Sequence, residues 1–329
     1  MLCYYKFSYQ KPDMPTYPRS LAFIAALTLC LSISAPSAGT PPRVVASIAP
    51  LHSLVSAIMQ DVAEPRLLLH GGESPHTFSL RPSDARMLHD ADLVFWIGPA
   101  LELPLARILE RMPSAKSVTL LSAPGVETLP ARDIHDLAGA GAGAEAHASH
   151  GKAADHLVDP HIWLSPGNAL AMSDTIERTL IERDPGNAQR YRANARRLRA
   201  RLEQLDLDLR HEFQGIDAGF IVYHDAYQYL EHRYDLHAVG SVTSHAERSP
   251  GAAHLRELRE KLADGRVQCV FSEPQYAAKL LRMLQGPHRL RHVVLDPLGV
   301  EFTPGPDLYE RMMRLIAEQL SGCLQATGT

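Results

Sequence analysis

Short apolar runs alternate with amphipathic, helix-like stretches along most of the chain. In the first half, the predicted strands are Val44–Ser47, Arg66–Leu69, Leu93–Trp96 and Ser117–Leu120. The second half repeats the alternation, with predicted strands at Phe220–Tyr223, Leu236–Val239, Val267–Phe271 and His292–Leu295. Continuously apolar strands separated by helices are typical of parallel sheets that are covered on both faces. The predicted fold class is therefore α/β, with two lobes built on parallel sheets.

A long helical stretch lies between the two series of strands. Ser165-Pro166 supplies an N-cap and a first-turn proline. After a break at Asp184–Asn187, the chain favours helix as far as Phe213, which at 1.5 Å per residue is roughly 35–40 Å. We expect an N-terminal lobe at residues 43–170, connecting helices at 171–213 and a C-terminal lobe at 214–329. The cleft between two such lobes is the usual place for a ligand.

The N-terminus predicts export. Arg19 precedes the apolar run Leu21–Ile33, which is shorter than the roughly 20 residues that span a bilayer, and small residues follow it. This order is typical of a cleaved signal peptide, here with an N-terminal extension, over residues 1–39. Two cysteines remain afterwards, Cys269 and Cys323. An even pair in an oxidising compartment favours a disulfide between the last helix and the sheet over two buried thiols.

The segment 133–155 breaks the alternation. It is rich in glycine and alanine without periodicity, and we expect a mobile loop there. Four histidines lie within or beside it: His135, His147, His150 and His156. Because imidazoles can bind metal ions, these histidines could collect a metal ion loosely near the cleft. They could equally have no role, because flexible loops accept almost any polar composition.

Charge and histidine content narrow the class of ligand. The formal net charge of the 329 residues is −4, and a nucleic-acid partner is therefore disfavoured. The 17 histidines are many for this length, and neutral imidazoles are metal ligands.

Four metal-type side chains follow predicted strands or the end of the loop. They are His76, His161, His224 and Asp296. Ligands of open α/β sheets bind beyond the carboxyl ends of the strands, so these residues could meet in one cleft. Three imidazoles and a carboxylate suit tetrahedral Zn²⁺. From spacing alone, a site shared by His76, His161 and His224 and three unrelated surface histidines remain about equally supported, since no short metal motif is present. Asp296 could instead cap a turn before Pro297.

Several segments carry a resemblance to a known family. They are Val45–Ile48, Ser74–His76, Ser79–Asp84, Ala91–Gly98, Asp159–Pro166, Tyr223–Tyr227, Phe271–Tyr276 and Leu295–Gly299. Together they resemble the zinc-specific periplasmic solute-binding proteins of bacterial ABC importers, from about Arg43 to Cys323.

The resemblance implies two Rossmann-like lobes joined by one long backbone helix. It also implies capture of Zn²⁺ by His76, His161 and His224 and its delivery to an ABC permease in the inner membrane. It implies a monomeric periplasmic protein that is not an enzyme, with the Cys269–Cys323 disulfide of the zinc-selective branch. Water or Asp296 completes the shell, because some relatives have a glutamate where this chain has Pro75. The alternatives are a binding protein for Mn²⁺ or Fe²⁺ of the same fold, and a zinc metallohydrolase with Glu73 as general base.

Overall fold

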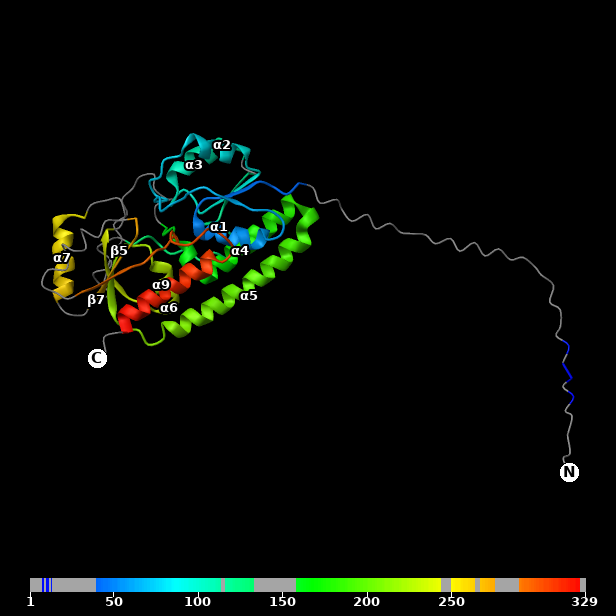
Figure 1. Cartoon of the computed structure of the whole chain (residues 1–329). Helices are drawn as coiled ribbons and strands as arrows, with labels where there is room; N and C mark the ends of the chain where they lie inside the picture. Colours follow the sequence, from blue (N-terminus) through cyan, green and yellow to red (C-terminus); the bar gives the residue numbers. More distant parts are fainter. Residues whose placement is uncertain are drawn as a thin grey trace, which may run out of the picture. The chain divides into compact units, whose positions relative to one another are not determined.

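The computed structural model describes residues 40–113, 116–132, 158–243, 250–263, 267–275 and 290–325, together with a few positions before residue 40. The chain from Ala38 to Thr329 forms one compact unit (Figure 1). The predicted loop 133–155 and nearly all of the predicted signal segment lie outside the described residues. In the part of the chain that is described, no helix combines the length and the apolar character that crossing a membrane requires.

The first half of the unit contains a parallel four-stranded sheet with the order β2-β1-β3-β4. Its strands are β1 (Val44–Ala46), β2 (Arg66–Leu67), β3 (Leu93–Trp96) and β4 (Ser117–Thr119). Three helices connect them: α1 (Ala49–Met59), α2 (Pro82–Asp90) and α3 (Leu103–Leu109). All residues of β1 and β3 are buried, as expected for the central strands of a covered parallel sheet.

The second half contains a second parallel sheet, with the order β6-β5-β7-β8. Its strands are β5 (Gly219–His224), β6 (Ala238–Thr243), β7 (Val267–Ser272) and β8 (Arg291–Val294). The described helices around it are α6 (Gln228–Tyr234), α7 (Ala252–Ala263) and α9 (Leu308–Gln325). The α/β prediction is therefore confirmed, although β6 begins two residues after the start of the predicted strand Leu236–Val239 and ends four residues after its end.

Two helices connect the sheets, α4 (Pro166–Arg183) and α5 (Ala188–Glu212), with the short 3-10 turn Pro185–Asn187 between them. Ser165 caps α4 as predicted, because its hydroxyl accepts a hydrogen bond from the amide of Asn168 at 3.3 Å. With 25 residues, α5 is about 37 Å long, and Figure 1 shows it running along the unit beside α4 and α9.

Helix α5 is held by an apolar stripe and by polar contacts at its start. Leu198, Leu202, Leu205 and Leu209 are buried at three- and four-residue steps, and each contributes about 1.5–3 kcal/mol by leaving water. The side-chain amide of Asn194 donates to the carbonyls of Ile58 and Gln60, which caps the C-terminus of α1. One hydrophobic core therefore runs from α1 through α5 to the second sheet.

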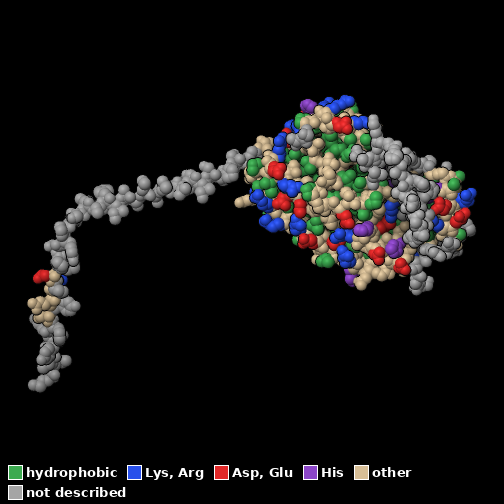
Figure 2. Space-filling view, turned by 180° about the vertical axis from the view of Figure 1, so that it is seen from behind, with side chains coloured by type: hydrophobic (Ala, Val, Ile, Leu, Met, Phe, Trp, Pro, Cys, Tyr) green, Lys and Arg blue, Asp and Glu red, His purple; other side chains and the backbone are tan. Residues whose placement is uncertain are grey.

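The C-terminal helix α9 joins elements from both halves of the unit. It packs against α1 and α5 and also against β7 and β8. A disulfide joins Cys323 of α9 to Cys269 of β7, which confirms the predicted pairing. On the face seen in Figure 2, acidic and basic side chains are interspersed, with no large area of a single sign.

Candidate metal centre

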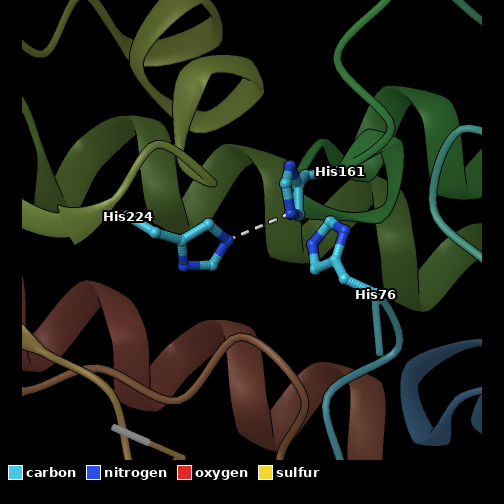
Figure 3. A group of neighbouring side chains, drawn as sticks. All are labelled: His76, His161 and His224. Carbon is cyan, nitrogen blue, oxygen red and sulfur yellow. Dashed lines mark hydrogen bonds between the residues drawn. The ribbon is translucent and has the colours of Figure 1, made fainter. Parts of the chain in front are cut away.

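Three histidines from separate parts of the chain meet at one point (Figure 3). His76 lies in the loop after β2, His161 directly precedes the 3-10 turn Ile162–Leu164, and His224 is the last residue of β5. A ring nitrogen from each lies within 4.8 Å of the others. His161 and His224 are buried, whereas His76 is half-buried. The structure thus brings together the three histidines that the sequence pattern singled out.

The spacing of the ring nitrogens suits a metal ion. The Nε2 atoms of His161 and His224 are 3.2 Å apart. Two nitrogen ligands of a tetrahedral Zn²⁺, each 2.0–2.1 Å from the ion, lie about 3.3 Å apart. A zinc ion therefore fits between these two rings without a large rearrangement.

A buried carboxylate holds each of these two rings. Nδ1 of His161 is 2.7 Å from Oδ1 of Asp159, and Nδ1 of His224 is 2.5 Å from Oε1 of Glu273. An ionised carboxylate can only accept, so Nδ1 of each ring carries the proton and Nε2 presents a lone pair. Two lone pairs 3.2 Å apart repel each other unless a proton or a cation lies between them. The pair of rings is therefore arranged to bind a positive charge.

Burial shifts the pKa values of two groups at the centre, and the shifts have different consequences. Burial lowers the pKa of His224, but the charge and the hydrogen bond of Glu273 outweigh burial, and the net pKa is raised. Burial raises the pKa of Asp159 to about 7, although the backbone N–H of His161 and the charge of Arg132 oppose this shift. The shift of Asp159 favours its neutral form, and a metal ion at the histidines would favour its ionised form, because opposite charges attract across a buried site.

The cavity at the histidines is small. Its volume is about 10 Å³, which is close to the room that one water molecule needs. Its walls come from both halves of the unit, and they include Ser74, Pro75, His76, His161, Trp163, His224, Glu273, Gln275, Pro297 and Leu298. The indole N–H of Trp163 donates to the carbonyl of Pro297 at 2.7 Å and so links these walls. Such a cavity suits an ion rather than an organic molecule.

Asp296 lies outside the histidine cluster. Its carboxylate accepts hydrogen bonds from the backbone amides of Leu298 and Gly299 at 3.0 Å each, and from that of Val300. It therefore stabilises the turn after β8, which was the alternative role considered from the sequence. Its role as fourth ligand remains a prediction that would require these hydrogen bonds to be given up.

Other acidic residues near the histidines are paired with arginines. The carboxylates of Asp225 and Glu231 bind the guanidinium of Arg132 in a nearly buried cluster. Glu73 forms an ion pair with Arg81 at 2.6 Å and is not part of the histidine cluster.

The contacts of Glu273 with His224 and of Asp159 with His161 were not predicted from the sequence. The only signal for Asp159 is its position two residues before His161, which allows a local hydrogen bond. No local signal exists for Glu273, which is 49 residues from His224. The histidines of the loop, His135, His147, His150 and His156, lie outside the described residues.

Two parallel α/β sheets, a long helix between them and a three-histidine centre with walls from both halves define a metal-binding solute-binding protein. Comparison with known sequences agrees. The chain belongs to the family of the zinc-uptake complex component A, periplasmic, which matches residues 44–323. The resemblance seen in the sequence is therefore confirmed.

Individual relatives cover nearly the whole chain. The high-affinity zinc uptake system protein ZnuA of Brucella abortus (strain 2308) is 38% identical, over 92% of this chain and 97% of that protein. The protein of the same name from Yersinia pestis is 33% identical over the same shares. A crystal structure of ZnuA matches with a TM-score of 0.73 at 25% identity, covering 86% of this chain and 99% of that one.

Proposed function

We propose that this protein captures Zn²⁺ with His76, His161 and His224 and delivers it to a membrane importer of the ABC type. The observation that carries the proposal is the histidine cluster, in which two carboxylate-bound rings direct Nε2 atoms at one point 3.2 Å apart. The names of the relatives support zinc as the cargo.

The protein's own residues account for capture without any chemical reaction. Asp159 and Glu273 orient two rings and make their Nε2 atoms more basic, as outer-shell carboxylates do at zinc sites. The half-buried His76, from the loop after β2, is the third histidine ligand. Binding stabilises the folded state by mass action, since the unfolded chain holds no such site. The long helix α5 limits hinge motion of the two halves.

The nitrogen-rich ligand set favours zinc over the alternative cargoes. Mn²⁺ prefers more oxygen ligands, and Fe²⁺ sites commonly include a carboxylate. The small cavity and the engaged carboxylates support binding rather than hydrolysis of an organic substrate. The protein is therefore not an enzyme in this proposal.

The remaining expectations belong to the same proposal. Residues 1–39 contain a signal peptide that is cleaved on export, and the mature protein is a periplasmic monomer. The lobes comprise residues 43–170 and 214–329, with the connecting helices at 171–213. The permease of the inner membrane binds both lobes, and the histidines of the 133–155 loop assist capture. The periplasmic family and the uptake names of its members support this assignment.

The test is a zinc titration against a competing chelator, on the mature chain and on His76→Ala, His161→Ala and His224→Ala. His89→Ala is the matched control, because that ring is 87% exposed on α2. We expect one tight zinc per chain, lost in each of the three variants and kept in the control. Tight binding that survives all three changes would overturn the proposal.

A further inference from the structure

The side-chain amide of Gln275 is buried without a hydrogen-bond partner among the described residues. Both its Nε2 and its Oε1 are enclosed, and neither is paired with any group in that part of the chain. Buried polar groups are normally paired, and an unpaired one costs free energy. An amide that is left unpaired in a folded protein therefore points to a ligand that would pair it.

Gln275 also lines the cavity of the three histidines. Within the described ranges, it is the one residue that both lines this cavity and has buried polar side-chain atoms without a partner. It follows β7 by three residues and stands two residues after Glu273, which holds His224. The same short segment thus supplies one group that orients a ligand histidine and a second group that faces the cavity.

The neighbouring carboxylates are already engaged. Glu273 binds His224, Asp296 binds backbone amides of the turn after β8, and Glu73 is paired with Arg81. Three histidine nitrogens leave one position of a tetrahedral Zn²⁺ open. A water molecule in that position has two O–H groups to donate, and it needs acceptors. The free Oε1 of Gln275 is such an acceptor.

We propose that Gln275 is a further positioning residue of the metal site, and that its carboxamide oxygen accepts a hydrogen bond from the water that completes the coordination of zinc. This inference rests on the proposed function, since it takes zinc as the ion at the three histidines. It explains why a polar side chain is kept in a place where it has no protein partner.

The decisive variant is Gln275→Leu, which keeps the approximate size and removes both polar atoms. Loss of an outer-shell partner weakens zinc binding about tenfold or more. The same change removes two unpaired buried groups, so the melting temperature of the metal-free protein stays equal or rises. A merely structural glutamine would show the opposite: lower stability and unchanged affinity.

Gln275→Glu provides a second, charged variant. A carboxylate facing the ion strengthens zinc binding about tenfold or more, because opposite charges attract across a buried site. Gln228→Leu is the matched control: its Oε1 is also buried without a partner, but it does not line the cavity. We expect this control to bind zinc within about twofold of the unchanged protein, because outer-shell effects require contact with the site.

The affinities are measured by chelator competition with Zn²⁺. The solvent ligand is detected on the Co²⁺-loaded protein, whose electron paramagnetic resonance lines broaden in ¹⁷O-enriched water when water is bound. Broadening in the unchanged protein, with the three affinity results above, supports the inference. Absence of broadening, or unchanged affinity in both Gln275 variants, overturns it. If the unchanged protein instead binds no zinc that depends on His76, the proposed function itself fails.

Discussion

Replacing Glu273 with glutamine removes the buried charge that orients His224. The carboxylate is 2.5 Å from Nδ1 of His224, and the two side chains are only 3% and 6% exposed. The amide oxygen of Gln can still accept the hydrogen bond, so the ring keeps its orientation while its basicity falls. Loss of such an outer-shell charge typically weakens metal binding 10–100-fold, which is about 1.4–2.7 kcal/mol.

The pH dependence gives the prediction a second part. Glu273 raises the pKa of His224 above the ordinary value of 6.5, so below that raised pKa zinc must displace a proton. In Glu273→Gln the proton is held less tightly, and competition begins at lower pH. The affinity deficit of the variant is therefore largest near pH 8 and shrinks as the pH falls toward about 6.

The raised pKa of His224 also makes the stability of the metal-free protein depend on pH, with the larger contribution at acidic pH. A histidine whose pKa is raised by folding stabilises the fold fully below about 6.5, its unfolded value, and this contribution is lost as pH rises through the raised pKa. Glu273→Gln lacks this contribution. Thermal unfolding of the metal-free variant should therefore lose most stability, relative to the unchanged protein, on the acidic side.

The assay is chelator competition from about pH 6 to 8.5, since this range brackets the titration of histidine. The control is Glu102→Gln, which also removes a fully buried carboxyl group but does not line the metal cavity. Its zinc affinity should match that of the unchanged protein at every pH. Equal affinity of Glu273→Gln and the unchanged protein near pH 8, with the same pH slope, would refute the reasoning.

Three further predictions concern stability. Burial raises the pKa of Glu102 from 4.5 to about 7, so the free energy of unfolding should fall by up to about 3 kcal/mol as the pH rises between these values. Urea unfolding of Glu102→Gln should show no such fall. The double variant Cys269→Ser, Cys323→Ser removes the disulfide, whose cysteines are 54 residues apart in the chain. It should lower the free energy of unfolding in urea by about 4 kcal/mol. Arg132→Met leaves the buried carboxylates of Asp225 and Glu231 unpaired and should lower the free energy of unfolding by about 3 kcal/mol. Part of this loss should be regained on acidification, which protonates the carboxylates. Unchanged stability would contradict the assigned cluster.

Local patterns predicted the secondary structure well, because hydrophobic periodicity and capping act over a few residues. The continuous apolar strands indicated parallel covered sheets, and the Ser165-Pro166 start of α4 was read correctly. The boundaries were less accurate where loops intervene. Strand β6, for example, begins at Ala238 and not at Leu236 as predicted.

The candidate site was only partly visible in the sequence. Its three histidines could be named because each follows a strand or the end of a loop, but the spacing alone did not decide that they share a site. Their convergence required the resemblance to the family, and the structure then placed their nitrogens within 4.8 Å. Cys269 and Cys323 could be paired beforehand because only two cysteines remain after the predicted signal.

The groups around the histidines depended on the tertiary structure alone. Strands β5 and β7 are adjacent in the order β6-β5-β7-β8, and their register pairs Val222 with Phe271. Two residues further along, His224 meets Glu273, which is the contact that orients the ring. By itself, the sequence determined which segments form strands and helices and which side chains could bind a metal, because those properties are local. Only the order and register of the strands decided which carboxylate holds which histidine and that Gln275 faces the cavity, because these contacts join residues that are distant in the chain.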